Sequence, residues 1–315
     1  MPMNTVRCNG ADCFADIYAQ TCDHLATHGF AVVDAWNAEP ATLVSIAQYF
    51  GRVQLHVRAN AMGVVGISTD AVVSGDWQGH RSEYTGLTSE EFLPHTDGSF
   101  VHGLARDGDG YIQLFPPKML ILQCAHNAAV GGGNVLIDGQ RIYEDLARDE
   151  PRMLQALSTK GCVAYCRDDQ MALDCAVFDT LDEGCVMLRF RYDAAAYVAD
   201  WAFDAFHRLQ ERYFSNPRYR TELKLAAGQV LLIDNYRMLH GRAAFSTAEN
   251  GHKRSLRRIW LARDRLPVLR NAADEHRDRR ALKRCEPYGV LSASMTYAPA
   301  SWLALGIRKP ARLPA

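Results

Sequence analysis

The fold is decided by one stretch of the sequence, Gln229-Val230-Leu231-Leu232-Ile233-Asp234-Asn235-Tyr236-Arg237-Met238-Leu239-His240-Gly241-Arg242. Its first five residues form an apolar run of the length expected for a buried strand. Asp234 and Asn235 follow, and these residue types favour a turn. The stretch then reaches His240, and a neutral imidazole is a common ligand of transition metals. We therefore interpret it as a core strand that leads, through a turn, to a candidate metal ligand.

Similar short apolar runs recur along the chain with turn residues between them. They predict strands at 30–33, 111–115, 118–124, 134–137, 161–166, 186–192, 229–233 and 255–261. Many short strands of this kind are typical of a β-sandwich or a closed barrel.

Apolar residues at helical spacing occupy other parts of the chain. They predict helices over 12–29, about 40–50, 139–159 with a break at Pro151, and 194–214. Residues 68–93 are polar and rich in Gly, Ser, Thr and Asp, which predicts a long irregular segment that acts as a lid. Because no repeat or linker divides the chain, the sequence predicts a β-rich α+β fold in one domain of residues 1–315.

Composition restricts the classes of function. Of the 315 residues, 48% are hydrophobic and 23% are charged, which suits a soluble enzyme with a large core. The net charge of -1 argues against a nucleic-acid partner. No segment approaches the roughly 18 uninterrupted apolar residues of a membrane span, and the nine cysteines, an odd number, indicate reduced thiols. We expect a cytoplasmic protein with a small-molecule substrate and without a nucleic-acid or membrane partner; the oligomeric state stays open.

Several common catalytic motifs are missing from the sequence. The chain has no Gly-x-Gly-x-x-Gly dinucleotide turn, no Walker A loop, no Gly-x-Ser-x-Gly elbow and no His-Glu-x-x-His helix. This argues against nicotinamide chemistry, phosphoryl transfer and serine hydrolysis.

A second candidate metal motif is the segment Leu93-Pro94-His95-Thr96-Asp97-Gly98. Residues two apart on an extended strand point to the same side, so His95 and Asp97 can hold one ion between them. A second histidine would complete the two-His-one-carboxylate triad typical of non-haem Fe(II), which leaves positions for a co-substrate and O2. His240 is the preferred third ligand, because no competing histidine follows a core strand in this way. The competitors are His80, His102 and His126.

Residues 253–261 predict a strand with an unusual charge pattern. Arg254, Leu256 and Arg258 would share one of its faces. A guanidinium that points into a barrel needs an anionic partner, and its planar fork pairs bidentately with a carboxylate. Taken alone, the pattern favours a solvated basic edge strand or a phosphate-binding patch. Together with the candidate metal ligands, it indicates an anchor for an anion.

These residues, in this order, resemble the taurine dioxygenase and clavaminate synthase group of Fe(II)/2-oxoglutarate-dependent oxygenases. The resemblance covers about residues 29–264 and includes the turn Gly131-Gly132-Gly133-Asn134. It implies a double-stranded β-helix, or jelly roll, as the core, with flanking helices, which agrees with the strand pattern. Residues 265–315 form a C-terminal extension to which no role is assigned.

The resemblance also implies a set of site residues. His95, Asp97 and His240 would bind Fe(II), and Arg254, fourteen residues after His240, would bind the distal carboxylate of 2-oxoglutarate. Arg258 would approach either 2-oxoglutarate or an anionic group of the substrate. The co-products would be succinate and CO2, and hydroxylation is the expected outcome, with desaturation and ring closure left open.

Two positions bear on the details of this chemistry. Related sequences usually carry a Thr whose hydroxyl contacts 2-oxoglutarate where this chain has Asn134, whose amide can donate instead. Relatives that halogenate carry Ala or Gly at the carboxylate position, so Asp97 implies an oxygenase.

Candidates for substrate contact are Tyr84 in the 68–93 segment, Phe100 just after the metal pair, Arg191 and Arg258. Arg189, Arg191 and Asp193 would share a face, although the pattern slightly favours an exposed strand with ordinary charge pairs. This placement of charge predicts a small polar or anionic substrate, such as an amino acid or a derivative. Two alternatives stay open: a non-catalytic sensor that binds metal or 2-oxoglutarate, and a jelly-roll metalloenzyme that does not use 2-oxoglutarate.

Overall fold

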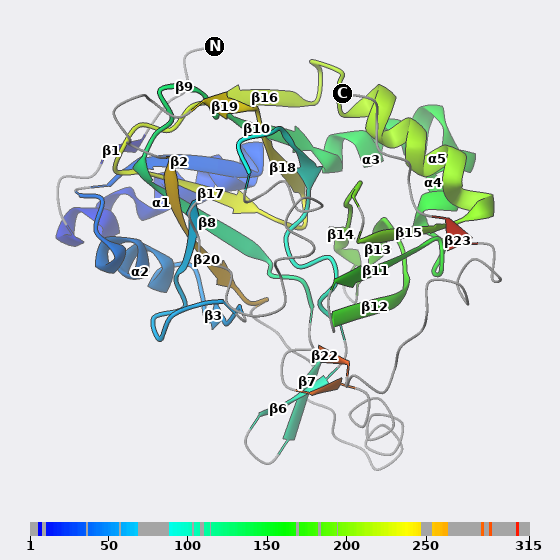
Figure 1. Cartoon of the computed structure of the whole chain (residues 1–315), viewed down its shortest axis with the longest axis horizontal. Coiled ribbons are helices and arrows are strands. Elements are labelled where there is room, and N and C mark those ends of the chain that lie inside the picture. The colour runs from blue at the N-terminus through cyan, green and yellow to red at the C-terminus, as the bar shows by residue number, and fades with distance from the viewer. Residues whose placement is uncertain are drawn as a thin grey trace. The chain divides into compact units, whose positions relative to one another are not determined.

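A computed structural model describes most of the chain (Figure 1). The described residues are 6–7, 11–35, 37–56, 58–68, 88–102, 104–107, 110–113, 115–167, 170–181, 184–193, 195–246, 254–263, 285–286, 290–291 and 307–308. The chain divides into two compact units, each built from three stretches. The first consists of Met1–His95, Pro117–Gly139 and Pro217–Ala262, and the second of Thr96–Pro116, Gln140–Asn216 and Arg263–Ala315. The single domain expected over residues 1–315 stays a prediction.

The first unit contains a seven-stranded sheet. Its strands, in sheet order, are β1 (Val6–Arg7), β2 (Phe30–Asp34), β17 (Gln229–Asp234), β8 (Met119–His126), β20 (Ser255–Leu261) and β3 (Val53–Gln54), and β4 (Val65–Ser68) also pairs with β20. Neighbouring strands are antiparallel, except for the parallel pair β1 and β2. The predicted strands at 30–33, 118–124, 229–233 and 255–261 are confirmed.

A second sheet of the same unit has four antiparallel strands. In order, they are β16 (Arg220–Leu223), β10 (Asn134–Asp138), β18 (Met238–Arg242) and β5 (Phe92–His95). A short pair, β9 (Val130–Gly131) with β19 (Phe245–Ser246), lies nearby in sequence. The stretch 229–242 thus supplies β17 to one sheet and β18 to the other.

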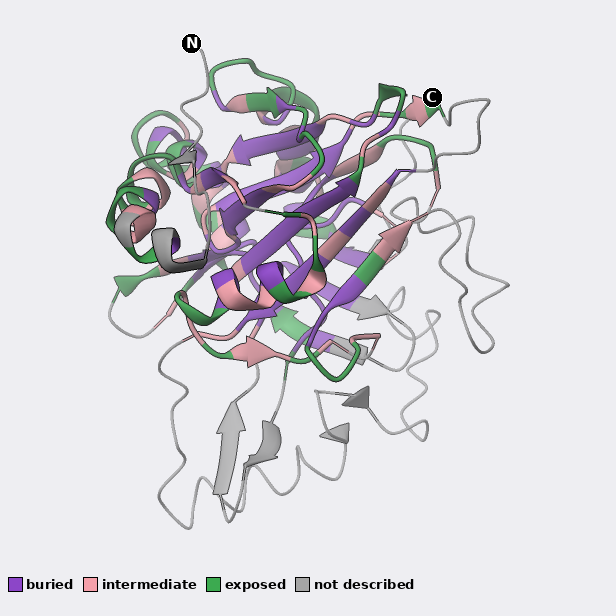
Figure 2. Cartoon of the chain, turned by 90° about the vertical axis from the view of Figure 1, so that its left-hand side faces the viewer, coloured by how far each residue is buried: buried purple, intermediate pink, exposed green. Residues whose placement is uncertain are grey.

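Two helices pack on one face of the seven-stranded sheet (Figure 1). They are α1 (Ala11–His28) and α2 (Pro40–Gln48). In α2, Leu43 and Ile46 lie one helical turn apart and are fully buried, together with Phe14 of α1. They pack against Ile121 and Ile259 from the sheet, whose central strands are largely buried (Figure 2). Apolar burial of this kind contributes about 25 cal/mol per Å².

Glycine and proline set the ends of these helices as the sequence predicts. Gly29 follows α1 with a φ of 75°, which side chains other than glycine rarely adopt. A Cβ at Gly29 would lie 2.6 Å from the sulfur of Met238, a flexible side chain that could shift, so the need for glycine here comes from the backbone angle. Pro40 begins α2 at the first helical position, where its missing N–H costs nothing. None of the helices that the structure describes is both long enough and apolar enough to span a membrane.

The second unit has a six-stranded sheet. In order, its strands are β21 (Cys285–Glu286), β22 (Val290–Leu291), β12 (Gln170–Cys175), β11 (Val163–Arg167), β15 (Ala196–Ala199) and β23 (Ile307–Arg308). Two hairpins accompany it: β6 (Leu104–Asp107) with β7 (Gly110–Gln113), and β13 (Phe178–Thr180) with β14 (Val186–Leu188). Described residues of the C-terminal extension, in β21, β22 and β23, therefore join this sheet.

The helices of the second unit confirm one prediction and correct another. A pair of helices, α3 (Gly139–Asp149) and α4 (Pro151–Ser158), is broken at Pro151 as predicted. The predicted helix over 194–214 is wrong in its first part, because β15 occupies residues 196–199 and pairs with β11. Helical structure follows in η5 (Asp200–Ala202), α5 (Phe203–Arg208) and the π-helical η6 (Leu209–Tyr213). Tyr197 and Val198, both strand-forming types, are buried by this pairing.

Glu150 lies between α3 and α4, and its carboxylate forms hydrogen bonds that are expected to stabilise the second unit. Tyr213 donates a hydrogen bond to its carboxylate at 2.7 Å and Arg208 donates another at 2.5 Å. These contacts, that from Tyr213 foremost, lower the pKa of Glu150 below its ordinary value of 4.5. The stabilisation is therefore present above about pH 4.5 and is lost as the pH falls through the lowered pKa. We expect Glu150→Gln to lower Tm at pH 7 and to lower it progressively less towards pH 3.

The matched control for this prediction is Glu144→Gln, at an exposed position of α3. Thermal unfolding followed by circular dichroism between pH 3 and pH 7 measures both variants. A deficit in Glu150→Gln that does not change with pH would mean that the carboxylate's charge does not stabilise the unit.

Candidate metal centre and its pocket

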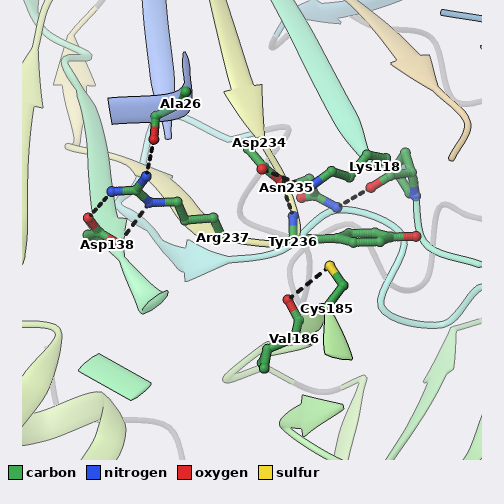
Figure 3. A network of polar contacts seen from close by, with 10 residues as sticks. Ala26, Lys118, Asp138, Cys185, Val186, Asp234, Asn235, Tyr236 and Arg237 are labelled. Carbon is green, nitrogen blue, oxygen red and sulfur yellow. Dashed lines mark hydrogen bonds and ion pairs between the residues drawn. The ribbon is translucent and has the colours of Figure 1, made fainter. Parts of the chain in front are cut away.

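The turn between β17 and β18 is fixed from both sides (Figure 3). The Lys118 ammonium forms an ion pair with the Asp234 carboxylate at 2.7 Å. On the other side, the Arg237 guanidinium donates to both carboxylate oxygens of Asp138, at 3.2 and 2.7 Å. Bidentate pairs of this kind fix direction as well as distance. These contacts fix the turn and therefore the direction of β18, which begins directly after it. His240 is the third residue of that strand.

Strand register brings His240 to His95. In the antiparallel pair of β18 and β5, the two histidines are direct partners, and the centroids of their imidazole rings lie 4.3 Å apart. Both side chains are buried. A Cβ at Gly241 would lie only 2.6 Å from the Phe92 carbonyl oxygen, so glycine is needed for the two strands to approach this closely.

Asp97 completes the group, although not in the way that the strand argument predicts. β5 ends at His95, and Asp97 opens a turn that Gly98 continues with a φ of 68°. The three residues nevertheless come together. His95, Asp97 and His240 each offer one ligand atom, and these three atoms lie within 4.8 Å of one another. Asp97 is only 2% exposed. Among the residues that the structure describes, this is the one group of His, Cys, Asp and Glu side chains that could hold a metal ion.

The surroundings of His95 orient its ring. Its Nδ1 lies 3.0 Å from the Leu93 carbonyl oxygen, so the tautomer protonated at Nδ1 donates there and leaves Nε2 for a metal. The Phe92 ring packs against the imidazole, with 4.1 Å between centroids. Two imidazoles and one carboxylate, all buried, are a donor set that suits Fe(II).

A pocket that is partly open to solvent adjoins the two histidines within the first unit. Both sheets line it: Val65, Gly66, Ile67, Leu122, Leu256 and Arg258 come from the larger sheet, and Phe92, His95, Asn134, His240, Gly241 and Arg242 from the smaller one, with Arg58 and Arg254 completing the wall. The structure therefore brings together the predicted residues Asn134, Arg254 and Arg258.

The two faces of β20 have different environments. Arg254 and Arg258 line the pocket with Leu256, as the alternation predicts. On the opposite face, Ile259 lies in the hydrophobic core, and Arg257 donates to the side-chain oxygen of Gln123 at 3.2 Å. The alternative of a solvated basic edge strand is wrong, because β20 lies inside the sheet and both pocket arginines are buried.

Arg254 is the residue whose environment points most directly to an anionic ligand. It is 5% exposed, and burial lowers the pKa of its guanidinium. Within the part of the chain that the structure describes, no carboxylate pairs with it; its guanidinium carbon lies 5.7 Å from the centre of the Phe245 ring. A buried charge without a counter-ion is costly, so the site is built to receive one.

Gly132 makes room for the Arg254 side chain. Its φ is 71°, and a Cβ there would lie 3.1 Å from Arg254 Cδ and 3.2 Å from Arg254 Nε. We expect Gly132→Ala to shift the guanidinium and to weaken 2-oxoglutarate binding about tenfold, equivalent to about 1.4 kcal/mol.

The neighbouring glycine offers a matched control for that substitution. A Cβ at Gly133 would meet only an ordinary contact, 3.5 Å from the Leu223 carbonyl oxygen. Equilibrium titration of 2-oxoglutarate into both variants under anaerobic conditions, with Fe(II) present, measures the difference. Equal affinities in Gly132→Ala and Gly133→Ala would show that the turn does not position Arg254.

The residues predicted to contact the substrate differ in their location and burial. Arg258 lines the pocket, with its guanidinium carbon 4.9 Å from the Trp260 ring centre. Phe100 is buried in the second unit, and Tyr84 lies outside the described residues. Arg191 is 1% exposed and donates to the Asp193 carboxylate at 2.9 Å.

The strand predicted over 186–192 is confirmed for Val186–Leu188 only, and the exposed strand expected around Arg189 and Arg191 is wrong. β14 ends at Leu188, and both Arg189 and Arg191 lie beyond it in irregular backbone, where they are buried. The alternation of side chains in that segment therefore does not apply. Arg191 has a carboxylate partner in Asp193.

Two further arginines, Arg242 and Arg58, line the pocket wall. Arg242, which is part of the Leu-His-Gly-Arg element, donates to the Glu90 carbonyl oxygen and lies over the Phe245 ring at 4.8 Å. Arg58 was not predicted at all. It stands in an irregular stretch between β3 and β4, where neither periodicity nor a motif distinguishes it.

Comparisons with known proteins agree with this geometry. The sequence profile described as "Taurine catabolism dioxygenase TauD, TfdA family" matches residues 11–260. Gamma-butyrobetaine dioxygenase from Homo sapiens is 26% identical over 178 residues, which are 50% of this chain and 45% of that protein, so the match spans less than half of that relative. Uridine-5'-phosphate dioxygenase from Amycolatopsis sp is 24% identical over 267 residues, covering 81% of this chain and 93% of that protein.

Solved structures share the fold. An asparagine oxygenase in complex with Fe(II), 2S,3S-3-hydroxyasparagine and succinate has a TM-score of 0.57 at 15% identity, and the match covers 80% of each chain. A taurine dioxygenase from Burkholderia xenovorans has a TM-score of 0.54 at 18% identity, covering 82% of this chain and 88% of that one.

The profile match, which covers well over half of the chain, and the shared fold assign this protein to a class of dioxygenases. Within that class, the chain is a member of the taurine catabolism dioxygenase TauD, TfdA family. The resemblance seen in the sequence is thereby confirmed.

Proposed function

We propose that the chain oxidises a small polar or anionic substrate, such as an amino acid or a derivative, with succinate and CO2 as co-products and hydroxylation as the outcome. The observation that carries this proposal is the buried Arg254, which lines the same pocket as His95 and His240 and has no carboxylate partner among the described residues. A dicarboxylate that binds a metal at one end and a guanidinium at the other would fit this arrangement.

The residues take the following roles in the proposal. His95, Asp97 and His240 hold Fe(II), which supplies the activation of O2 when bound. Arg254 binds the distal carboxylate of 2-oxoglutarate, and Asn134, buried on β10, donates an amide hydrogen bond to it. The apolar residues Leu122 and Leu256 of the pocket wall limit the access of water to the reacting groups.

The proposal includes a jelly-roll core. Its support is the pair of largely antiparallel sheets in the first unit, both of which line one pocket. Sheets stacked in this way, with β17 in one and β18 in the other, are expected of a double-stranded β-helix.

The substrate class rests on charge and on the relatives. The pocket wall carries four arginines, and the names of relatives and neighbours include gamma-butyrobetaine, uridine-5'-phosphate and asparagine, all small polar molecules. The proposal keeps the cytoplasmic location, since the described cysteines Cys22, Cys124, Cys162, Cys175 and Cys185 are free thiols.

One experiment separates this function from its alternatives. Fe(II) and 2-oxoglutarate are added to the protein anaerobically, and the visible charge-transfer band of the chelated co-substrate is recorded; O2 is then admitted and succinate is assayed with candidate amino acids and nucleotides. We expect a band, followed by succinate. A missing band would contradict the proposal and favour a metalloenzyme that does not use 2-oxoglutarate, whereas a band without succinate would favour a sensor.

A further inference from the structure

We infer that Thr96 is a positioning residue for Asp97: its side chain fixes the turn that carries the Asp97 carboxylate. This inference rests on the part of the proposed function in which Asp97 binds Fe(II), and it adds a residue to that site. β5 ends at His95, so strand pairing does not place Asp97. Contacts of the turn itself must therefore place it, and those described below lie within the second unit.

Thr96 and Phe190 form a pair in which a side chain completes a backbone pattern. The Thr96 backbone N–H donates to the Phe190 carbonyl oxygen at 2.9 Å. In return, the Phe190 N–H donates to the Thr96 hydroxyl oxygen at 3.0 Å. In a regular antiparallel pair a backbone carbonyl would accept this second bond. Both residues are fully buried, so the two hydrogen bonds are shielded from bulk water.

Phe190 is a rigid partner for Thr96. Its ring stacks on the Phe206 ring with 4.5 Å between centroids, and it meets the Phe214 ring edge-on at 4.8 Å. Closely packed aromatic side chains of this kind hold their positions, because any shift would lose contacts on several sides. The backbone of Phe190 is therefore a fixed point to which the turn is attached.

Arg189 holds the other side of Asp97. Its guanidinium, only 2% exposed, donates to the Ser99 carbonyl oxygen at 3.3 Å. The Arg189 backbone is itself fixed, because its carbonyl oxygen accepts a hydrogen bond from the Tyr165 hydroxyl at 2.7 Å. Asp97 thus lies between Thr96 and Ser99, which are attached to two consecutive residues of one buried segment.

The turn at Asp97 needs these attachments because glycine follows it. Gly98 has a φ of 68°, and a glycine has more backbone freedom than any other residue. The contact from Thr96 to Phe190 restricts the backbone immediately before Asp97, and the contact from Arg189 restricts it after Gly98. Residues that orient metal ligands typically change metal affinity by about 10–100-fold when they are replaced. Thr96 is expected to act in this way through Asp97.

The test compares Thr96→Val and Thr96→Ser with the wild-type protein. Valine has nearly the shape of threonine but cannot accept the Phe190 N–H, whereas serine keeps the hydroxyl. Fe(II) is titrated calorimetrically into each protein under anaerobic conditions, without 2-oxoglutarate. We expect Fe(II) affinity to fall at least about tenfold in Thr96→Val and to stay close to the wild-type value in Thr96→Ser.

Thr21→Val is the matched control for lost stability. Thr21 is also fully buried, and its hydroxyl donates to the Ile17 carbonyl oxygen at 2.9 Å within α1, a helix that carries none of the proposed ligands. We expect this variant to have a lower Tm and wild-type Fe(II) affinity. Thermal unfolding shows whether each variant folds. If Thr96→Val does not, Thr96→Ala takes its place, because it leaves room for a water molecule to accept the Phe190 N–H without fixing the turn.

A double-mutant cycle shows whether Thr96 acts through Asp97. Asp97→Ala is expected to lower Fe(II) affinity, and adding the substitution at Thr96 should then cause no further loss. Wild-type affinity in the Thr96 variant, or an equal further loss in the Asp97→Ala background, would overturn the inference. Wild-type affinity in Asp97→Ala would overturn the ligand role of Asp97 as well. Because 2-oxoglutarate is absent from these titrations, a missing charge-transfer band would contradict the proposed function and leave their result intact.

Discussion

His95→Ala is expected to abolish the charge-transfer band and to lower succinate formation by at least about a thousandfold. The substitution removes one of the three proposed ligands, whose ligand atoms lie within 4.8 Å of one another. A carboxylate and one imidazole hold a divalent ion far less well than the complete group. A bound metal contributes several kcal/mol to catalysis, and each 1.36 kcal/mol is about tenfold in rate.

The control for this variant is His126→Ala. His126 lies at the exposed end of β8 and is one of the histidines that compete for the ligand role in the sequence. We expect it to keep the wild-type band and turnover. Iron content, measured after anaerobic loading and desalting, gives a second readout. Full iron binding by His95→Ala would exclude this residue as a ligand.

Gly241→Ala is expected to damage both the fold and the metal centre without removing a ligand. The new Cβ would lie 2.6 Å from the Phe92 carbonyl oxygen and 3.0 Å from the Pro94 nitrogen, and both are backbone atoms that cannot rotate away. β5 must therefore move away from β18, and overpacking of this kind costs about 1–3 kcal/mol. Because His95 and His240 are partners across the same two strands, we expect Fe(II) affinity to fall at least about tenfold, as for other disturbed metal shells.

Thermal unfolding and anaerobic Fe(II) titration measure the two effects of this substitution. Gly66→Ala is the control for stability, because a Cβ at Gly66 of β4 meets no atom within 4 Å. We expect an unchanged Tm for that variant. Wild-type stability and iron affinity in Gly241→Ala would mean that the two strands tolerate a wider separation than the structure indicates.

Much of the fold and the metal centre could be predicted because the signals are local. The alternation on β20 separates Arg258 from Ile259, and the apolar run of β17 followed by a turn leads to His240. Helix ends follow from Gly29 and Pro40, whose backbone preferences depend little on tertiary context.

Other features depend on contacts between distant segments. Residues 196–199 read as the start of a helix, but pairing with β11 makes them a strand. Tertiary pairing overrides weak local preference in such cases. Arg58 has no local signal at all, since its place in the pocket wall depends on the packing of His56 against Trp260, 204 positions further along the chain by their numbers.

The pairing of His95 with His240 makes the proposed iron site a property of the folded chain. The two ligands belong to β5 and β18 and are far apart in sequence, so an unfolded chain cannot present them together. Any ligand that binds only the folded state stabilises it by mass action, by about 2.7 kcal/mol at a concentration of 100 times Kd. In the proposed function, iron bound by both histidines would therefore link β5 to β18 and stabilise the folded state of this strand pair.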